Sequence, residues 1–276
     1  MLTPKSLQSL AAHQAAYQAK LNRLPYYPIV RPIVEEFLKQ IISYGAFYIR
    51  VKIDDLDAIL QSKRIKNMME TGKGATLGGK ETRMAVTEHL FGCNAKKLLP
   101  SEFPKYGFLS QPNAVRDLVV NAEMWMQYGD VSIQLKKDRL MHRTTLCVGD
   151  SVNFGRDQTL VPTRVDDVKA TCICGLPQNG KLDMQMPDPL VFYGIFANWV
   201  IKKKLTLDNF PSIDNLVEDI PPVFEFFELQ YHGEIDITQD VERIDIIPSS
   251  EEEKKKMLEF KEKFAAIGVR MEVDEF

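Results

Sequence analysis

One carboxylate stands out because of its apolar surroundings. Glu228 follows Phe226 and Phe227 in a run of strand-forming residues that continues to Tyr231. A strand this apolar is expected to be buried, and a buried carboxylate is costly unless it is paired or opens onto a pocket. Two interpretations follow. Either Glu228 faces a pocket and acts on a ligand there, or its strand lies at a sheet edge and the carboxylate faces solvent.

An arginine lies in an earlier segment with a strand-like pattern. Arg50 belongs to residues 46–53, AFYIRVKI, whose composition and period predict a strand. A guanidinium on a strand beside a cleft can hold a phosphate or ribose oxygen through its planar set of donors. Lys52 points to the same face of the strand and competes for this role. The other alternative is an exposed Arg50 without a ligand.

A segment with several hydroxyl side chains lies between Arg50 and Glu228 in the sequence. Residues 143–151, RTTLCVGDS, predict a strand that begins with Thr144 and Thr145 and a turn that ends at Ser151. Taken alone, this is ordinary strand and turn chemistry.

Two aromatic rings precede the hydroxyl segment. Tyr106 and Phe108 lie in residues 103–109, FPKYGFL, which predict a turn that leads into a strand. The order along the chain is the informative feature: arginine, aromatic pair, hydroxyl strand, glutamate.

This order, and above all residues 226–235, FFELQYHGEI, resembles the catalytic core of bacterial toxin and effector ADP-ribosyltransferases. The resemblance covers roughly residues 46–248, and 143–151 is its other specific part. It implies an α+β fold, an ADP-ribosyltransferase-like split β-sheet core with an N-terminal helical lobe, and NAD as the substrate.

The resemblance also implies residue roles. Glu228 and Arg50 become the catalytic pair, and Arg50 anchors NAD as well. Breaking the nicotinamide–ribose bond builds positive charge on the ribose, which a fixed carboxylate stabilises where it develops. The resemblance implies five further NAD-site residues. Either Tyr106 or Phe108 packs on nicotinamide, and the hydroxyls of Thr144, Thr145 and Ser151 brace the glutamate.

Departures from the family pattern bear on the acceptor. There is no literal Ser-Thr-Ser, and Phe226 stands where arginine-modifying members have Glu or Gln, which argues against an arginine acceptor. Gln230 and His232 are the candidate acceptor-binding residues. The whole pattern most resembles the effector group that modifies a threonine of ubiquitin. It implies secretion from a bacterium and action on a host protein in the cytoplasm of the target cell.

The elements that must position these residues change in type along the chain. Helices are predicted at 6–23 and 32–44, so that residues 1–45 form a helical lobe and 46–276 the catalytic domain. Further helices are predicted at 54–60, 113–127, 188–202 and 249–266. Further strands are predicted at 131–135, 144–148, 168–174, 223–231, 241–247 and 269–273.

A glycine-rich segment at 70–82 invites a phosphate-loop interpretation. Its sequence, ETGKGATLGGKET, lacks the GxxxxGK[ST] spacing because Glu81 follows Lys80. We therefore expect a loop near the NAD cleft, with a simple linker as the alternative, and not the phosphate loop of a kinase or NTPase.

Bulk properties narrow the function classes. The net charge of -3 argues against a generic nucleic-acid binder, and no apolar run reaches the roughly 20 residues that span a membrane. Cys172 and Cys174 lack a second ligand pair, so no metal site is expected. Two alternatives stay open: an ADP-ribosyltransferase that acts on nucleic acid, and an inactive transferase-fold binding protein.

Overall fold

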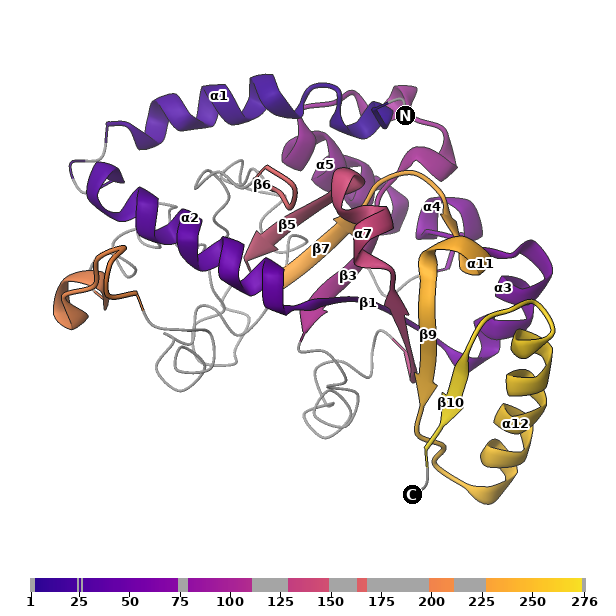
Figure 1. Ribbon diagram of the computed structural model, residues 1–276. Helices are drawn as coiled ribbons and strands as arrows, with labels where there is room; N and C mark the ends of the chain where they lie inside the picture. The colour runs from indigo at the N-terminus through magenta and orange to yellow at the C-terminus, as the bar shows by residue number, and fades with distance from the viewer. Residues whose placement is uncertain are drawn as a thin grey trace.

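The computed structural model describes residues 3–23, 25, 27–73, 79–110, 129–148, 163–167, 199–210 and 227–274 (Figure 1). These residues form an α+β fold. Its α-helices are α1 (Leu10–Leu21), α2 (Tyr27–Tyr44), α3 (Leu56–Ser62), α4 (Met68–Thr71), α5 (Gly79–Phe91), α7 (Lys137–Leu140), α11 (Ile237–Asp240) and α12 (Glu251–Ala265). Short 3-10 helices are η1 (Lys5–Leu7), η2 (Ile53–Asp55), η3 (Ala95–Lys97), η4 (Pro100–Glu102) and η7 (Met141–Arg143).

The strands form one large sheet and one small one. The large sheet has the order β10-β9-β4-β1-β3-β7-β5-β6, and β2 pairs with β8 apart from it. Within the large sheet β9 and β10 are parallel, and the other pairs are antiparallel. The strands are β1 (Ala46–Val51), β2 (Arg64–Ile65), β3 (Lys105–Ser110), β4 (Val131–Leu135), β5 (Thr144–Val148), β6 (Thr163–Arg164), β7 (Phe227–Tyr231), β8 (Ile235–Asp236), β9 (Val241–Ile246) and β10 (Met271–Val273).

The large sheet opens between β1 and β3. β1 pairs with β3 only over Ala46–Tyr48, whereas its pairing with β4 continues from Phe47 to Val51. Figure 1 accordingly shows β3, β7 and β5 running in a different direction from β9 and β10. On the β4 side the contact is close: Gly129 has a φ of 123°, and a Cβ there would lie 2.2 Å from the Val51 carbonyl. Only glycine fits this approach.

The two faces of the sheet differ in chemistry because side chains alternate along each strand. One face is apolar and buried, with Phe47, Ile49, Ile133, Leu229, Tyr231 and Ile244. The opposite face carries buried polar residues on β9, β4 and β1 and, beyond β3, on β7 and β5: Asp245, Ser132, Arg50, Glu228, Gln230 and Thr145.

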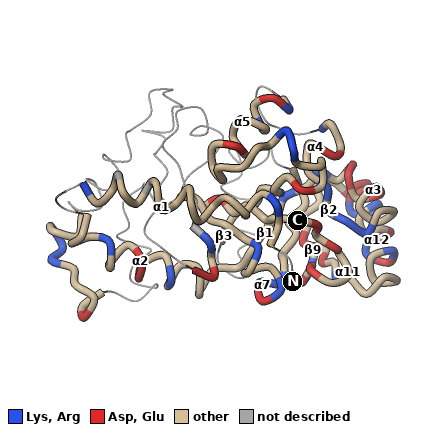
Figure 2. Tube along the Cα trace, turned by 90° about the horizontal axis from the view of Figure 1, so that it is seen from above, with Lys and Arg blue, Asp and Glu red and all other residues tan. Residues whose placement is uncertain are grey.

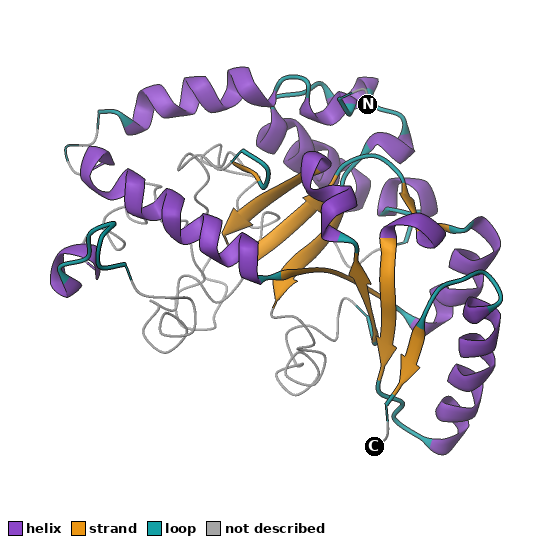
Figure 3. Ribbon diagram, in the orientation of Figure 1, coloured by secondary structure: helices purple, strands orange, loops and turns teal. Residues whose placement is uncertain are grey.

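Helices lie against both faces of the sheet: α2 packs on the apolar face, and Arg83 of α5 contacts Tyr106 on the polar face. Phe37 of α2 packs on Phe227 with ring centroids 6.2 Å apart, and α12 packs beside β10 (Figure 3). Residues of η1, α1 and α2 share one continuous hydrophobic core with the strands. The N-terminal helices therefore form a cover for the sheet.

Most predicted elements inside the described ranges are present. The strands at 131–135 and 144–148 have the predicted bounds, and α12 begins after Ser250, whose Oγ accepts from the Glu253 amide as the sequence predicts. The helix at 113–127 and the strand at 168–174 lie outside the described residues. Of the helix at 188–202, only its C-terminal end falls inside them, where residues 199–203 are helical.

Two predictions at the N-terminal side are wrong. The second helix begins at Tyr27, so Pro32 lies inside α2 and not at its first position. Burial of Tyr27 and Val30 in the first turn offsets the backbone hydrogen bond that the proline removes. The predicted loop at 70–82 is too long at both ends, because α4 continues to Thr71 and α5 already begins at Gly79. α5 buries Leu90 and Phe91 at its other end.

Candidate active site

The sheet brings the two principal candidate residues to the same face. Glu228 on β7 lies opposite Phe108 on β3, and Phe108 lies opposite Tyr48 on β1. Arg50 is two residues beyond Tyr48, so its side chain leaves the strand on this face. Tyr106 occupies the same face of β3. The arginine, the aromatic pair and the glutamate thus come from three adjacent strands.

The side-chain amide of Gln230 links Thr145 on β5 to Glu228 by two hydrogen bonds. Gln230 Nε2 donates to Glu228 Oε1 at 2.6 Å, and Thr145 Oγ1 donates to Gln230 Oε1 at 2.8 Å. The glutamate is 6% exposed and the other two residues are fully buried. Thr144 points to the other face, where its hydroxyl donates to the Leu140 carbonyl at 2.8 Å. Only one of the two predicted threonines therefore supports Glu228.

His232 is fully buried behind this group. Its Nδ1 lies 2.8 Å from Ser6 Oγ and its Nε2 lies 3.0 Å from Thr145 Oγ1. The ring also packs edge-on against Phe91, with centroids 4.7 Å apart. Both ring nitrogens are hydrogen-bonded inside the protein. An acceptor could contact them only if these bonds opened, and the contact of His232 with an acceptor stays a prediction.

His232 makes the fold sensitive to acid. Burial, aided by the positive charges of Lys105, Arg143 and Arg164, lowers the pKa of His232 from 6.5 to about 3. Below pH 6.5 the unfolded chain binds a proton that the native state refuses. The stabilisation is therefore complete above pH 6.5 and is lost as pH falls toward the folded pKa.

We expect the free energy of unfolding to fall by about 2 kcal/mol between pH 7 and pH 5 because of this one group. Urea denaturation at both pH values measures the loss. The His232→Gln variant should show a much flatter dependence than the wild type. Equal slopes in the two proteins would refute the assignment.

Arg50 is a buried cation with unused donors. It is 9% exposed, and neither its Nε nor its Nη1 has a hydrogen-bond partner among the described residues. Burial lowers the pKa of Arg50, and the charge of Asp130 partly opposes this shift. Ser132 lies opposite Arg50 on β4, and its buried Oγ also lacks a partner within the described part of the chain. Buried polar groups are normally satisfied, so these atoms mark a place for a polar ligand or water.

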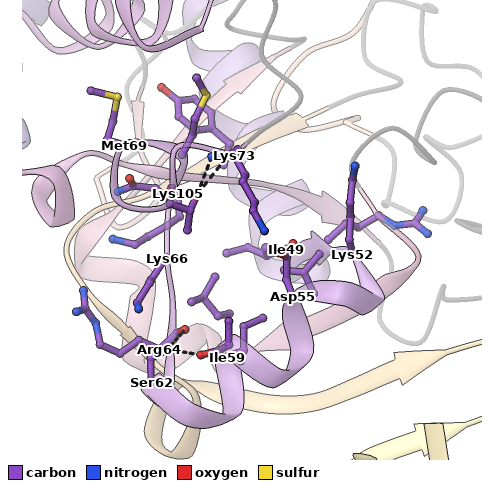
Figure 4. A pocket seen from close by; sticks show the side chains of 18 of the residues that line it. Ile49, Lys52, Asp55, Ile59, Ser62, Arg64, Lys66, Met69, Lys73 and Lys105 are labelled. Carbon is purple, nitrogen blue, oxygen red and sulfur yellow. Dashed lines mark hydrogen bonds between the residues drawn. The ribbon is translucent and has the colours of Figure 1, made fainter. Parts of the chain in front are cut away.

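A cavity of about 530 Å³ lies where β1 and β3 separate (Figure 4). Its walls come from the end of β1, from η2, α3 and α4, from Arg83 of α5 and from the beginning of β3. This volume is in the range of small-molecule sites. Two aspartates and seven cationic residues line it, the latter being Arg50, Lys52, Arg64, Lys66, Lys73, Arg83 and Lys105.

Some of these cations are neutralised inside the protein. Arg64 pairs with Glu70 at 3.0 Å and with Glu234 at 2.9 Å. Lys105 donates to the Gly233 carbonyl at 2.7 Å, and burial lowers its pKa to about 8. The cavity wall also includes three exposed lysines, Lys52, Lys66 and Lys73, and the buried Arg50. The cavity thus suits an anionic ligand.

The aromatic candidates already have neighbours. The guanidinium carbon of Arg83 lies 3.7 Å from the ring centroid of Tyr106, a cation–π contact. Burial raises the pKa of Tyr106, the charge of Arg83 opposes the shift and that of Glu228 adds to it. Phe108 stacks on Tyr48 with centroids 5.6 Å apart. Of the two rings, only Tyr106 lines the cavity.

The sequence interpretation missed three residues of this neighbourhood. Ser6 and Arg83 come from helical segments far from the strands in sequence, and Ser132 belongs to an unremarkable strand. Strand pairing puts Ser132 opposite Arg50, but nothing in the sequence order predicts the positions of Ser6 and Arg83. Ser151, Cys172 and Cys174 lie outside the described residues.

The described residues hold no group of three or more His, Cys, Asp or Glu side chains placed to bind a metal. Within them, no helix has the length and apolar character needed to cross a membrane. Figure 2 shows basic and acidic residues interspersed along α2 and around α3 and α12.

No protein-family model matches the chain, and a search of curated proteins finds no significant match.

Proposed function

We propose that the protein is an NAD-dependent mono-ADP-ribosyltransferase with the split-sheet architecture of that family. The observation that carries the proposal is the placement of Arg50 and Glu228 on one polar sheet face, with Tyr106 on the strand between them. The chain order of these residues resembles the family, and the sheet register puts Arg50 and Glu228 on the same face, on the two strands that flank β3.

The cavity supports a ligand with phosphate groups. Arg50 offers buried donors that have no partner among the described residues, and a guanidinium fork suits phosphate oxygens. Exposed lysines on the wall would attract a dianionic pyrophosphate. Tyr106 lines the cavity and belongs to β3, the strand between those of Arg50 and Glu228. It offers a ring for the nicotinamide, with Arg83 on one of its faces.

The chemistry assigned to Glu228 is electrostatic. In the proposed reaction the bond between ribose C1′ and the nicotinamide nitrogen breaks, and its electron pair leaves with nicotinamide, which becomes neutral. Positive charge develops on the ribose, and the buried carboxylate stabilises it at short range and low dielectric. A hydroxyl oxygen of the acceptor then bonds to C1′ and its proton passes to solvent.

The acceptor and the setting rest on the sequence resemblance. It favours a hydroxyl acceptor on a host protein, with a threonine of ubiquitin as the first candidate, and a bacterial effector that is secreted into the target cell. Gln230 and His232 are buried, so acceptor contact by either requires the polar face to open.

The test of the catalytic proposal is a time course of nicotinamide release from NAD by the purified protein, with NAD affinity measured by calorimetry. Binding with release supports the transferase. Binding without release, also in the presence of ubiquitin and of host lysate, favours the inactive transferase-fold alternative. Absence of binding contradicts both.

A further inference from the structure

We infer that Ser6 and His232 are positioning residues for Glu228, which makes the N-terminal segment part of the catalytic machinery. The four hydrogen bonds of this chain join Ser6 to His232 at 2.8 Å, His232 to Thr145 at 3.0 Å, Thr145 to Gln230 at 2.8 Å and Gln230 to Glu228 at 2.6 Å. Every member is buried. The geometry stands by itself, and its catalytic consequence rests on the proposed function.

The donor and the acceptor in each of these four hydrogen bonds follow from the chemistry of the groups that they join. The amide nitrogen of Gln230 can only donate, so Glu228 accepts, and the amide oxygen of Gln230 must accept from Thr145. The threonine hydroxyl has one proton and gives it to Gln230. It must therefore accept from His232, whose Nε2 carries the hydrogen. Nδ1 of the neutral ring is left as an acceptor, and Ser6 donates to it.

All four donors thus point toward the carboxylate. Hydrogen bonds in one direction polarise one another, and a buried, fully satisfied network holds its members in a single arrangement. Removing the first hydroxyl leaves Nδ1 of His232 without its donor and frees the ring to turn. The threonine then loses the donor that fixes its own hydroxyl direction.

The surroundings keep this arrangement in one protonation state. Lys105, Arg143 and Arg164 place positive charge near the ring. The backbone of His232 is also fixed, because its amide donates to the Arg143 carbonyl at 2.9 Å and its own carbonyl accepts from Arg143 Nη1 at 2.9 Å. The ring is held on its backbone side by η7 and at its two nitrogens by η1 and β5.

The N-terminal segment therefore has a second role besides covering the sheet. Ser6 lies 226 residues from His232 in sequence, and the two meet only when η1 is docked. Any ligand or partner that displaces η1 would release the ring and, through it, loosen Glu228.

The structural part is tested by NMR on full-length protein with labelled histidine and glutamine side chains. In the wild type, Nε2 of His232 should carry the hydrogen. The Ser6→Ala variant should shift the side-chain amide signals of Gln230, and Ser43→Ala, on an exposed serine at the end of α2, should not. A hydrogen on Nδ1, or unchanged Gln230 signals in Ser6→Ala, overturns the inference whether or not the protein cleaves NAD.

The catalytic part is tested by kinetics of nicotinamide release. Ser6→Ala should lower kcat roughly tenfold, because small misplacements of a catalytic group are expensive, and leave KM for NAD within about twofold. His232→Leu should lower it further, and His232→Gln, which keeps a donor near the position of Nε2, should restore part of the loss. Unchanged kcat, or a change confined to KM, overturns the positioning role. If the wild type releases no nicotinamide, the proposed function fails, and the NMR result alone decides the coupling.

Discussion

The Glu228→Gln variant is expected to release nicotinamide roughly 10²- to 10³-fold more slowly than the wild type and to bind NAD with nearly the same affinity. The substitution removes the charge and keeps the shape. The amide oxygen of the new side chain can still accept from Gln230 Nε2, so the neighbouring hydrogen bonds survive. The lost energy is the stabilisation of positive charge on the ribose, which exists only in the transition state.

Matched measurements make this result specific. Glu242→Gln removes a carboxylate from an exposed position on β9 and should leave turnover unchanged. Thermal unfolding of both variants checks that the fold is intact. A Glu228→Gln protein that is folded, binds NAD and turns over at the wild-type rate would remove Glu228 from the mechanism.

The second large effect is expected at Arg50 and has two parts of opposite sign. Arg50→Met should weaken NAD binding by roughly ten- to a hundredfold, because a hydrogen bond to a charged group contributes about 1.5–3 kcal/mol. The same variant should unfold at higher denaturant concentration without ligand. It replaces a buried guanidinium, whose Nε and Nη1 have no partner among the described residues, by an apolar side chain of similar length.

This pair of measurements separates a ligand-binding arginine from a structural one. A structural Arg50 would make the methionine variant less stable and leave NAD affinity unchanged. Lys52→Met is the control, since Lys52 lines the same cavity but is exposed, and it should weaken NAD binding far less. A larger loss at Lys52 than at Arg50 would exchange their roles.

The sequence predicts the strands better than it predicts the connections between them. β4, β5 and β9 follow from their alternating patterns, and Ser250 marks the beginning of α12 through its capping bond. α5 was missed because its glycine and polar residues read as loop, whereas tertiary contacts of Leu90 and Phe91 stabilise it. The predicted start of the second helix at Pro32 is wrong for a similar reason, since burial of the first turn outweighs the preference of proline for the first helical position.

For the candidate site, the sequence supplies the residues but not their environment. Glu228 stood out as a carboxylate in an apolar strand, and the sheet register then places it on the polar face with Arg50. Which threonine lies on the same sheet face as Glu228 depends on how the strands are aligned, and the register puts Thr145, not Thr144, on that face, opposite Gln230. The contact of Ser6 with His232 and of Arg83 with Tyr106 depends on helix docking, which local patterns do not encode.

The most direct measurement of the central claim is transfer of label from adenylate-labelled NAD to a macromolecule. Purified protein is incubated with host-cell lysate and, separately, with ubiquitin, beside the Glu228→Gln variant. We expect one discrete labelled protein, absent with the variant, whose mass increases by one ADP-ribose on a hydroxyl side chain. Label on nucleic acid would keep the chemistry and replace the acceptor. Absence of label, together with absence of nicotinamide release, would contradict the assignment of this protein as an ADP-ribosyltransferase.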